Sequence, residues 1–374
     1  MGKHQKVVHP PQENIEIKQL WNHLKTDLKD AMELFSPAFL VPVIISIILL
    51  CIFVLRLYIR WNVPCKSQKR LEGKTVIITG LGRATASELA KRGAKIILAC
   101  RNQKRGEAVA RIIRNKTGNE DINAYYLDLA SLRSIKEFVY EFNSREPYLH
   151  VLINNAGYLG PKATTEDGYE RTFGVNYLGH FYLSYLLKEK MKKCAPCRIV
   201  NVASSAYTIG KIDFEDLALT NYNIYKAYAR SKLAQIQFTI EAHRRWSPDV
   251  VLSYAVHPGA VSTDLLRNWP GLKGKVLRMA RNFLFKSPED GCQTIVHCAV
   301  GEGLRDVSGN LFTNCAIVQT KKNIREKQVC RKLWDLSLHL CGLDDEIEKF
   351  SSESEDMEQN HNKPNPEQES KKSK

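Results

Sequence analysis

Six short apolar segments, each separated from the next by a helical segment, constrain the fold of this chain most strongly. They lie at residues 75–79, 95–100, 122–127, 149–153, 198–203 and 250–256. Strands that alternate with helices form a parallel sheet, and continuous Val, Ile and Leu suits strands that are covered on both faces. The sequence therefore predicts an α/β fold of the doubly wound, Rossmann-type class, as a single domain over residues 71–343. Ligands of such folds bind at the carboxyl ends of the strands.

A second constraint is a run of 22 residues without a charged side chain, at positions 34–55. The hydrocarbon core of a bilayer needs about 20 apolar residues in a helix. A cleaved signal peptide is disfavoured because the run begins far from the first residue and no small-residue cleavage site follows. We expect a transmembrane anchor at 34–55, a polar segment at 1–33 before it and a basic linker at 56–70 after it.

Flanking charges predict the orientation of this anchor. Six Lys and Arg residues follow the run between positions 56 and 74, and only Lys18, Lys25 and Lys29 precede it at similar range. The positive-inside rule then places the C-terminal side in the cytosol. Lys371 and Lys372, near the end of the chain, resemble the dilysine retrieval signal of endoplasmic-reticulum membrane proteins. The tail at 344–374 has many charges and few apolar groups, so we expect it to be disordered.

Charge and cysteine usage exclude several classes of protein. The net charge of +15 suits an anionic membrane surface or an anionic cofactor. No basic stripe with interleaved aromatic residues is present, so we do not expect nucleic acid as a partner. The ten cysteines are scattered, which favours a reducing compartment. Cys194 and Cys197 have no second cysteine pair, and we expect no metal site.

Tyr228 and Lys232 are the first candidates for chemistry, because a helix places residues four apart on one face. A nearby cation favours the phenolate and lowers the pKa of a tyrosine from about 10 toward the working pH. Such a pair can exchange protons with an alcohol or a carbonyl. The alternative is a surface pair on an amphipathic helix, since the same spacing also occurs at Tyr158/Lys162, Tyr207/Lys211 and Tyr222/Lys226.

Residues at the predicted strand ends strengthen the first interpretation. In order along the chain they are Thr79-Gly80, Asp128, Asn154-Asn155-Ala156-Gly157, Asn176, Ser204, Tyr228 with Lys232, and Pro258-Gly259. This order and spacing resemble the short-chain dehydrogenase/reductase family over about residues 71–343. The amino-acid sequences around these residues are similar to those of the membrane-bound retinol dehydrogenase-like branch of that family.

The resemblance implies roles for four residues. Tyr228 would be the catalytic acid and base, and Lys232 would lower the pKa of Tyr228 and hold the nicotinamide ribose. Ser204 would hydrogen-bond the reacting oxygen, and Asn176 would hold a water that links Lys232 to solvent. Taken singly, Ser204 is equally an ordinary turn serine, and Asn176 is equally a helix asparagine satisfied by the backbone.

The end of the second strand indicates which cofactor to expect. It reads Cys100-Arg101-Asn102, without the acidic residue that binds the ribose 2′-hydroxyl of NAD. An arginine suits the 2′-phosphate of NADP, so we predict NADP(H), the alternative being a solvated basic helix start. The resemblance implies that the cofactor also contacts Thr79, Gly80, Leu81, Gly82, Asp128, Asn154, Gly157, Tyr228, Lys232, Pro258, Gly259 and Thr263.

One stretch departs from the family. The glycine-rich turn of the family reads TGxxxGxG, whereas this chain reads Thr79-Gly80-Leu81-Gly82-Arg83, four residues shorter. That turn normally presents backbone N–H groups and a helix N-terminus to the pyrophosphate. Three explanations stand open: the start of the helix unwinds to supply the loop, cofactor affinity falls, or the sequence lacks four residues of the natural chain.

These features predict a membrane-anchored, NADP(H)-dependent oxidoreductase acting on a lipophilic alcohol or carbonyl, with homo-oligomerisation left open. The alternative is a catalytically impaired relative that serves as a membrane scaffold or regulator. A further segment at 272–286 has Val276, Leu277, Ala280, Phe283 and Leu284 on one helical face. It is either a helix packed on the core or a lid that lies on the membrane and admits substrate.

Overall fold

The structure is a computed structural model that describes residues 13–34, 37–265 and 269–345. It divides into two compact units, residues 1–58 and residues 59–374. Residues 346–374, and with them the dilysine motif and nearly all of the tail expected to be disordered, lie outside the described residues.

The first unit contains two helices, α1 (Glu13–Leu34) and most of α2 (Pro37–Arg60). Residues 40–60 of α2 are long and apolar enough to cross a membrane, as the uncharged run predicts. The sequence interpretation described residues 1–33 only as polar and missed α1. The helical part of the apolar stretch also extends beyond the predicted end at residue 55, to Arg60.

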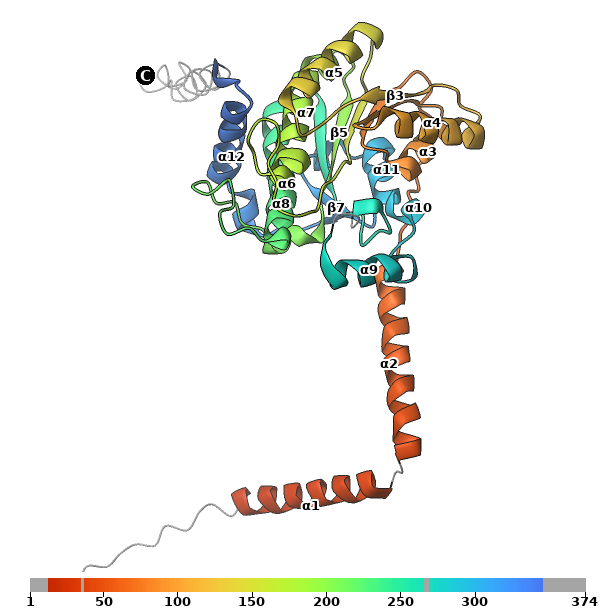
Figure 1. The fold of residues 1–374 in the computed structure, drawn as a ribbon, viewed down its shortest axis with the longest axis vertical. Helices are drawn as coiled ribbons and strands as arrows, with labels where there is room; N and C mark the ends of the chain where they lie inside the picture. Colours follow the sequence, from red (N-terminus) through yellow and green to blue (C-terminus); the bar gives the residue numbers. More distant parts are fainter. Residues whose placement is uncertain (1–12, 35–36, 266–268, 346–374) are drawn as a thin grey trace, which may run out of the picture. The chain divides into compact units, whose positions relative to one another are not determined.

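The second unit is built on one sheet of eight strands (Figure 1). The strands are β1 (Thr75–Thr79), β2 (Lys95–Cys100), β3 (Ile122–Tyr126), β4 (Val151–Asn154), β5 (Cys197–Val202), β6 (Val251–Val256), β7 (Leu311–Thr313) and β8 (Ala316–Val318). Their order is β3-β2-β1-β4-β5-β6-β7-β8; neighbours from β3 to β7 pair in parallel and β8 pairs antiparallel to β7. The order reverses between β1 and β4, which is where a Rossmann-type sheet binds its ligand. The predicted fold class is confirmed.

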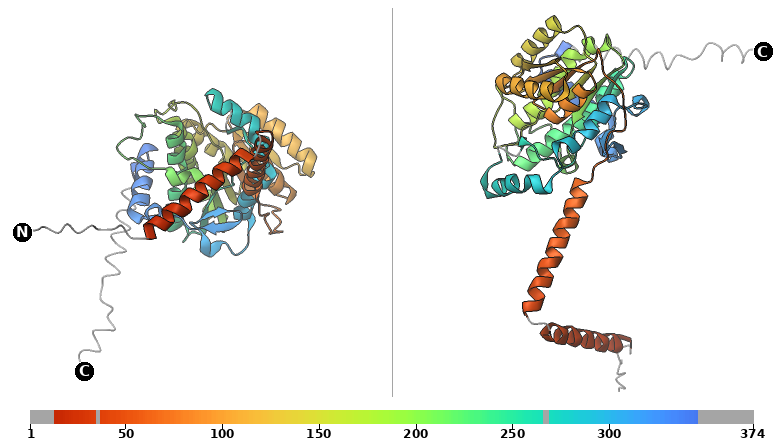
Figure 2. Two further views of the ribbon diagram at one scale, coloured as in Figure 1. Left: turned by 90° about the horizontal axis from the view of Figure 1, so that it is seen from below. Right: turned by 90° about the vertical axis from the view of Figure 1, so that its right-hand side faces the viewer.

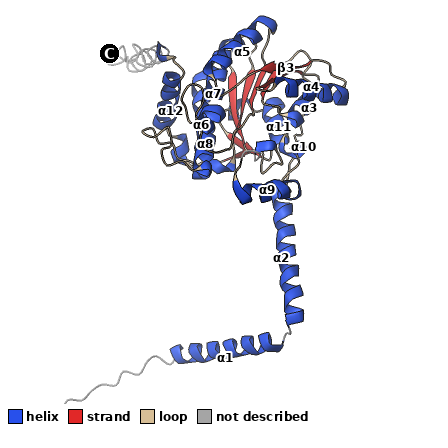
Figure 3. Cartoon of the chain, viewed as in Figure 1, coloured by secondary structure: helices blue, strands red, loops and turns tan. Residues whose placement is uncertain are grey.

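Helices cover both faces of this sheet (Figures 2 and 3). On one face lie α5 (Leu132–Arg145), α7 (Gly179–Lys192), α8 (Ile224–Trp246) and α12 (Lys327–Leu340). On the other lie α3 (Arg83–Lys91), α4 (Gln103–Thr117) and α11 (Gln293–Val300). The strand residues between them are fully buried, as Ile77 and Val76 illustrate with 0 % exposure each on opposite faces.

Two local differences separate this domain from the sequence prediction. The expected helix at 169–192 is broken into α6 (Arg171–Phe173), the π-helical turn η1 (Gly174–Leu178) and α7. The strands β7 and β8 were missed, because each has only three residues and gives no clear apolar periodicity. The broken helix matters for function, since π-helical turns occur frequently at functional sites.

The segment after the anchor is bound to the second unit. Asn62 Nδ2 donates to Asp290 Oδ1 at 3.3 Å, in the short helix α10 (Pro288–Gly291). Cys65 N donates to Gln293 Oε1 at 3.0 Å, and Arg92 Nη1 donates to the carbonyl of Ser67 at 2.7 Å. The stretch predicted as a linker at 56–70 is therefore packed along α10, α11 and α3 from residue 62 onward.

Candidate active site

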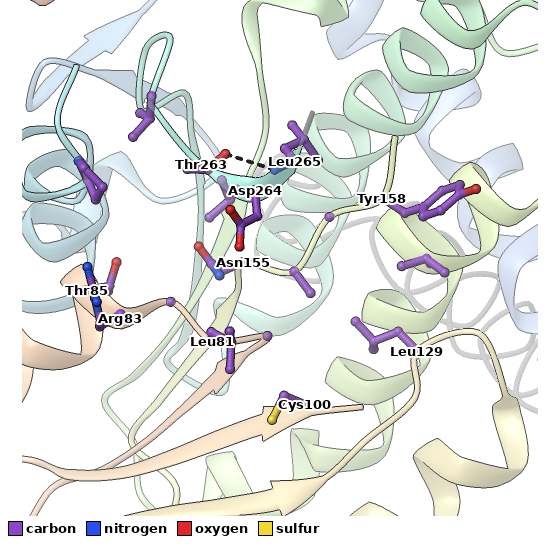
Figure 4. Close-up of a pocket in the computed structure, with 18 of the residues that line it drawn as sticks. Leu81, Arg83, Thr85, Cys100, Leu129, Asn155, Tyr158, Thr263, Asp264 and Leu265 are labelled. Carbon is purple, nitrogen blue, oxygen red and sulfur yellow. Dashed lines mark hydrogen bonds between the residues drawn. The ribbon is translucent and has the colours of Figure 1, made fainter. Parts of the chain in front are cut away.

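A cavity of about 1290 Å³ opens at the carboxyl ends of the strands. It is lined by twelve of the residues singled out from the sequence: Gly80, Leu81, Gly82, Arg101, Asp128, Gly157, Ser204, Tyr228, Lys232, Pro258, Gly259 and Thr263. Figure 4 labels part of this lining, from Leu81 and Arg83 at the β1–α3 turn to Thr263, Asp264 and Leu265 after β6 (Figure 4). Segments far apart in the sequence thus meet in one site.

Three predicted residues, Thr79, Asn154 and Asn176, do not line the cavity and are fully buried. The placement of Asn154 is corrected: its amide donates to Ser184 Oγ at 3.0 Å and to Asn201 Oδ1 at 2.8 Å, inside the sheet. Its neighbour Asn155 lines the cavity instead, because successive residues at a strand end point to opposite sides.

Thr79 connects the carboxyl ends of β1 and β4 next to the cavity through hydrogen bonds. Its hydroxyl accepts the N–H groups of Asn155 and Ala156, both at 2.9 Å. The Asn155 side chain returns a hydrogen bond to the Thr79 carbonyl at 3.0 Å. This reciprocal pairing holds β1 and β4 together at the point where the strand order reverses.

The shortened turn between β1 and α3 is tight and leaves the helix intact. Gly80 and Gly82 have φ values of 76° and 41°, in the left-handed region that favours glycine. A Cβ at Gly82 would come within 2.6 Å of Ile78 Cγ2. α3 begins at Arg83, so the helix start does not unwind to rebuild the missing loop. The first-turn N–H groups have no partner within the helix, and their residues Arg83, Ala84 and Thr85 line the cavity.

A basic rim follows the end of β2, where Arg101, Lys104 and Arg105 all line the cavity. Arg101 Nη1 lies 3.9 Å from Asp128 Oδ2. Arg105 Nη2 donates to Asp264 Oδ2 at 2.7 Å, and this hydrogen bond is the main reason why the pKa of Asp264 is lowered. The ion pair therefore joins two opposite parts of the cavity wall, 159 residues apart in the chain.

The proposed catalytic side chains come from α8 and the end of β5. The Asn223 side chain caps α8 by accepting the N–H groups of Tyr225 and Lys226. One turn later, the Tyr228 hydroxyl is hydrogen-bonded with the Ser204 side chain, and Lys232 Nζ lies 5.6 Å from the centre of the Tyr228 ring. Lys232 Nζ donates to the Val202 carbonyl at 2.6 Å.

Burial dominates the pKa values of this pair. It raises the pKa of Tyr228 to about 12, with the Ser204 hydrogen bond acting in the opposite direction. It lowers the pKa of Lys232 to about 8. The lowering of the Tyr228 pKa expected from Lys232 is not found in this arrangement, where the ammonium group is directed to Val202. At neutral pH the phenol is therefore protonated and available as a proton donor.

Asn176 occupies the π-helical turn but does not reach Lys232 with its side chain. Its Oδ1 accepts the N–H of Tyr158 at 2.6 Å, and its Nδ2 donates to the Tyr158 carbonyl and to Ser231 Oγ, both at 3.0 Å. The side chain thus braces the loop after β4 against α8. Its backbone carbonyl, in turn, accepts a hydrogen bond from Gln235 Nε2.

His180 was not recognised from the sequence, although it joins the two ends of the site. Its Nε2 lies 2.8 Å from Thr79 Oγ1, and its Nδ1 lies 2.9 Å from the Asn176 carbonyl. Burial lowers the pKa of His180 to about 3, so the ring is neutral in the physiological range. In the sequence, His180 is part of the segment GVNYLGHF, and this segment does not predict the contact with Thr79.

A buried ion pair fixes α8 against the broken helix. Arg230 and Glu170 have side chains that are each 1 % exposed, and Arg230 Nη2 lies 3.2 Å from Glu170 Oε2. Glu170 also accepts the N–H groups of Thr172 and Phe173 at the start of α6. Arg230 lies in α8 two residues from both Tyr228 and Lys232, so this pair helps to hold the helix that carries both candidates.

Comparison with known proteins agrees with this geometry. A family model described as short chain dehydrogenase matches residues 74–271, more than half of the chain. This chain belongs to the short-chain dehydrogenase family. It is 44 % identical to human retinol dehydrogenase 11 over 285 residues, which cover 75 % of this chain and 89 % of that protein. It is also 44 % identical to human retinol dehydrogenase 13 over 292 residues, covering 75 % and 88 %. The predicted resemblance to the retinol dehydrogenase-like branch is confirmed.

Solved structures support the same assignment. A crystal structure described as an NAD(P)-dependent gluconate 5-dehydrogenase from Beutenbergia cavernae, with bound NADP, is 25 % identical and has a TM-score of 0.53. It covers 66 % of this chain and 96 % of its own. The chain is thus an oxidoreductase of a family whose fold binds a nicotinamide cofactor.

Proposed function

We propose that this protein is a membrane-anchored, NADP(H)-dependent oxidoreductase that interconverts a lipophilic alcohol and its aldehyde or ketone. One observation carries the proposal: the proton-transfer group of Tyr228, Ser204 and Lys232 lines the same cavity as the basic rim of Arg101, Lys104 and Arg105. A proton donor and a site for a phosphorylated dinucleotide therefore share one space.

The residues present fit such a cofactor. The first turn of α3 directs N–H groups into the cavity, and helix N-termini favour phosphate groups. No acidic residue occurs between Arg101 and Gly106, so the rim would hold a 2′-phosphate without repulsion from its own segment. Asp128, fixed by the N–H of Ala130 at 3.0 Å, would lie near the adenine end. Gly157, Pro258, Gly259 and Thr263 would lie near the nicotinamide end.

The chain's own residues then handle the proton. When bound, the nicotinamide supplies or accepts the hydride. Ser204 orients the reacting oxygen, and Tyr228 gives its phenolic proton to that oxygen during reduction and takes a proton back during oxidation. Lys232 would hold the nicotinamide ribose and place a positive charge beside the phenolate that Tyr228 becomes.

The substrate class and the membrane address are parts of the same proposal. The named relatives are retinol dehydrogenases, and the cavity has apolar lining from Leu129, Val175 and Leu265. A retinoid-like or other lipid alcohol suits both. Residues 40–60 would anchor the protein in the endoplasmic reticulum with the second unit in the cytosol, as the flanking charges and Lys371-Lys372 predict.

Titration with NADPH and NADH, followed by nicotinamide fluorescence of the purified full chain, tests the cofactor assignment. We expect tighter binding of NADPH, and loss of that preference in the Arg101→Ala, Arg105→Ala double variant. Arg133→Ala, which changes an exposed arginine on α5, is the matched control and should retain the preference. Equal or tighter binding of NADH by the unaltered protein would contradict the proposal.

The shortened β1–α3 turn favours a second candidate, a scaffold or regulator that keeps the fold and binds cofactor poorly. Because α3 remains intact, fewer backbone N–H groups face the pyrophosphate than in a full-length turn. This candidate predicts no binding of either nucleotide at micromolar concentrations and no turnover of any lipid aldehyde. The same titration therefore separates the two candidates.

A further inference from the structure

The helix α9 (Gly271–Leu284) carries a row of exposed apolar side chains. Leu272, Val276 and Met279 are 76 %, 56 % and 77 % exposed. Steps of four and three residues place all three on one face of the helix. Ala280 and Leu284, on the flank of this row, are half-buried. The sequence left open whether this segment packs on the core; the structure shows that part of its apolar face does not.

The C-terminal end of α9 is joined, through α10, to the segment that follows the anchor. The anchor helix ends at Arg60, and Asn62 is already bound to Asp290 in α10. Two residues span at most about 7 Å, and the side chains of Asn62 and Asp290 meet at 3.3 Å, so α10 lies close to the end of the anchor helix. Only three residues, 285–287, separate α9 from α10. Chain connectivity therefore places the C-terminal end of α9 close to the residues that follow the anchor helix.

The charge of this region also suits a membrane. The stretch after the apolar run contains Arg56, Arg60, Lys66, Lys69, Arg70 and Lys74, without an intervening acid before Glu72. Lys275, on α9 itself, is exposed. Helices with an apolar row and basic neighbours bind the headgroup region of bilayers that contain anionic lipid.

α9 is connected to the wall of the active-site cavity. Arg281 Nη1 donates to the Thr263 carbonyl at 2.9 Å and lies 3.5 Å from Asp264 Oδ1. Lys286 N donates to the Ala260 carbonyl at 2.8 Å, and Ser262 N donates to the Lys286 carbonyl at 3.0 Å. Thr263, Asp264 and Ser262 all line the cavity, so the position of α9 determines one wall of it.

We propose that α9 docks on the phospholipid surface through Leu272, Val276 and Met279, and that lipophilic substrate enters the cavity from the bilayer beside it. This inference rests on the proposed membrane anchor. Docking of α9 would be a second, peripheral contact with the membrane, in addition to the anchor, and would orient the opening of the cavity toward the bilayer. A second copy of the chain or another protein on the same row is the competing occupant.

Photo-crosslinking of the full chain tests this docking directly. Benzoylphenylalanine replaces Met279 in one variant and the exposed Tyr140 of α5, the control, in another. Both proteins are reconstituted in phosphatidylcholine vesicles that contain about 20 % phosphatidylserine, which supplies an anionic surface. A trace of the phosphatidylcholine is radiolabelled. We expect several-fold more labelled lipid on position 279 than on position 140. NADPH binding by both variants checks that the site is intact.

Each outcome separates the docking from the proposed function. Flotation with the vesicles, without lipid cross-linking at 279 above the control, overturns the docking and leaves the anchor standing. A cross-linked band of twice the chain's mass, or a cross-link to another protein, also overturns it in favour of the competing occupant. Failure of the unaltered chain to float removes the anchor and the docking together.

Kinetics give an independent readout. A variant with Leu272→Ser, Val276→Ser and Met279→Ser replaces the three exposed apolar side chains of this row with small polar ones. We expect its KM for a long-chain aldehyde in vesicles to rise roughly tenfold, equivalent to about 1.4 kcal/mol. KM and kcat for a short, soluble aldehyde should not change. Equal losses for both aldehydes would show that the row supports the domain and does not deliver substrate.

Discussion

The two ends of the cavity are built in different ways. At the proposed catalytic end, Lys232 is 3 % exposed and donates to the Val202 carbonyl, and Asn176, which does not itself line the cavity, is 0 % exposed and donates to Ser231. At the phosphate end, Arg101 lies 3.9 Å from Asp128 with 63 % of its side chain exposed, and Arg105 and Asp264 are 49 % and 53 % exposed. Buried hydrogen bonds resist rearrangement, whereas exposed ion pairs contribute little and rearrange readily.

This difference in burial indicates which side chains are held in fixed positions and which can rearrange when a ligand binds. The positions of the proposed proton donor Tyr228 and its neighbours are set by buried protein contacts, and such an arrangement would favour catalysis by pre-organisation. A cofactor phosphate at the proposed phosphate end would have to exchange these ion pairs for its own contacts, next to the short turn Gly80-Leu81-Gly82. We therefore expect large effects from changes at the catalytic end and graded effects at the phosphate end.

The largest effect is expected from Tyr228→Phe, which removes the phenolic proton and little else. Turnover should fall roughly 10²- to 10⁴-fold, the usual contribution of a general acid, while NADPH binding changes little. Steady-state kinetics with a long-chain aldehyde measure this loss. Tyr222→Phe is the control: it removes the hydrogen bonds of the Tyr222 hydroxyl to the Gly160 carbonyl and with Thr172, and should stay near the activity of the unaltered protein. The opposite result would place the acid at Tyr222.

Glu170→Gln tests whether burial makes the catalytic end rigid. It would leave Arg230 as an uncompensated charge with 1 % of its side chain exposed. Breaking such a pair typically lowers the free energy of unfolding by about 3–5 kcal/mol. Glu137→Gln, in an exposed pair with Arg133, is the control and should cost less than about 1 kcal/mol. Chemical denaturation measures both, and equal losses would show that the two ends do not differ in this respect.

The next largest effect is expected on NADPH affinity when the turn between β1 and α3 is lengthened. Insertion of Ala-Asn-Ser-Gly after Gly80 restores the length of the family pattern. Two or three additional N–H contacts to pyrophosphate, each worth about 0.5–1.5 kcal/mol, should tighten NADPH binding roughly tenfold to a thousandfold. Fluorescence titration of both proteins decides the point. Low-micromolar binding that the insertion does not alter would show that the short turn already suffices, and absence of binding in both would favour the scaffold.

Particular residues show what the sequence could reveal at these two ends. Strands of continuous Val, Ile and Leu revealed the sheet, and motif order revealed Tyr228, Ser204 and Lys232, because periodicity and local spacing are written in the chain. The prediction of Asn154 depended on where β4 ends, which shifts by single residues and reverses the side that a side chain faces. His180 and the pair of Arg105 with Asp264 depend on contacts between distant segments, which no local pattern encodes.

The pKa of Lys232 predicts a smaller effect, on stability. Its pKa in the folded protein, about 8, lies below the ordinary value of 10.5 in the unfolded chain. The unfolded state therefore binds more protons between these values, and the protein should gain stability as the pH rises from about 8 to 10.5. Lys232→Met should abolish that gain. Without added cofactor at pH 7 it should stabilise the protein by about 1–3 kcal/mol, since one pKa unit corresponds to about 1.4 kcal/mol.

Denaturation curves of both proteins across this pH range test the Lys232 prediction. The difference between them cancels the contributions of the other lysines and tyrosines. A constant difference from pH 7 to 10.5 would contradict a lowered pKa at this lysine.

The smallest effect is expected from Asp264→Asn, which frees Arg105 for a 2′-phosphate. An exposed ion pair contributes about 0.2–1 kcal/mol, so NADPH should bind up to about fivefold more tightly while NADH is unaffected. The gain should shrink at high salt, because exposed charges are screened. Glu141→Gln, in an exposed pair with Arg145, is the control. A similar gain for NADH would locate the effect in loop position and not in charge.

The most direct test of the central claim is transfer of the hydride itself. NADPH deuterated at the transferable position of the nicotinamide is incubated with the full chain in vesicles and a long-chain lipid aldehyde, and the alcohol is analysed by mass spectrometry. We predict an alcohol that carries one deuterium, formed by the unaltered protein and by Tyr222→Phe but not by Tyr228→Phe. Absence of deuterated alcohol from the unaltered protein, or an equal amount from Tyr228→Phe, would contradict the account.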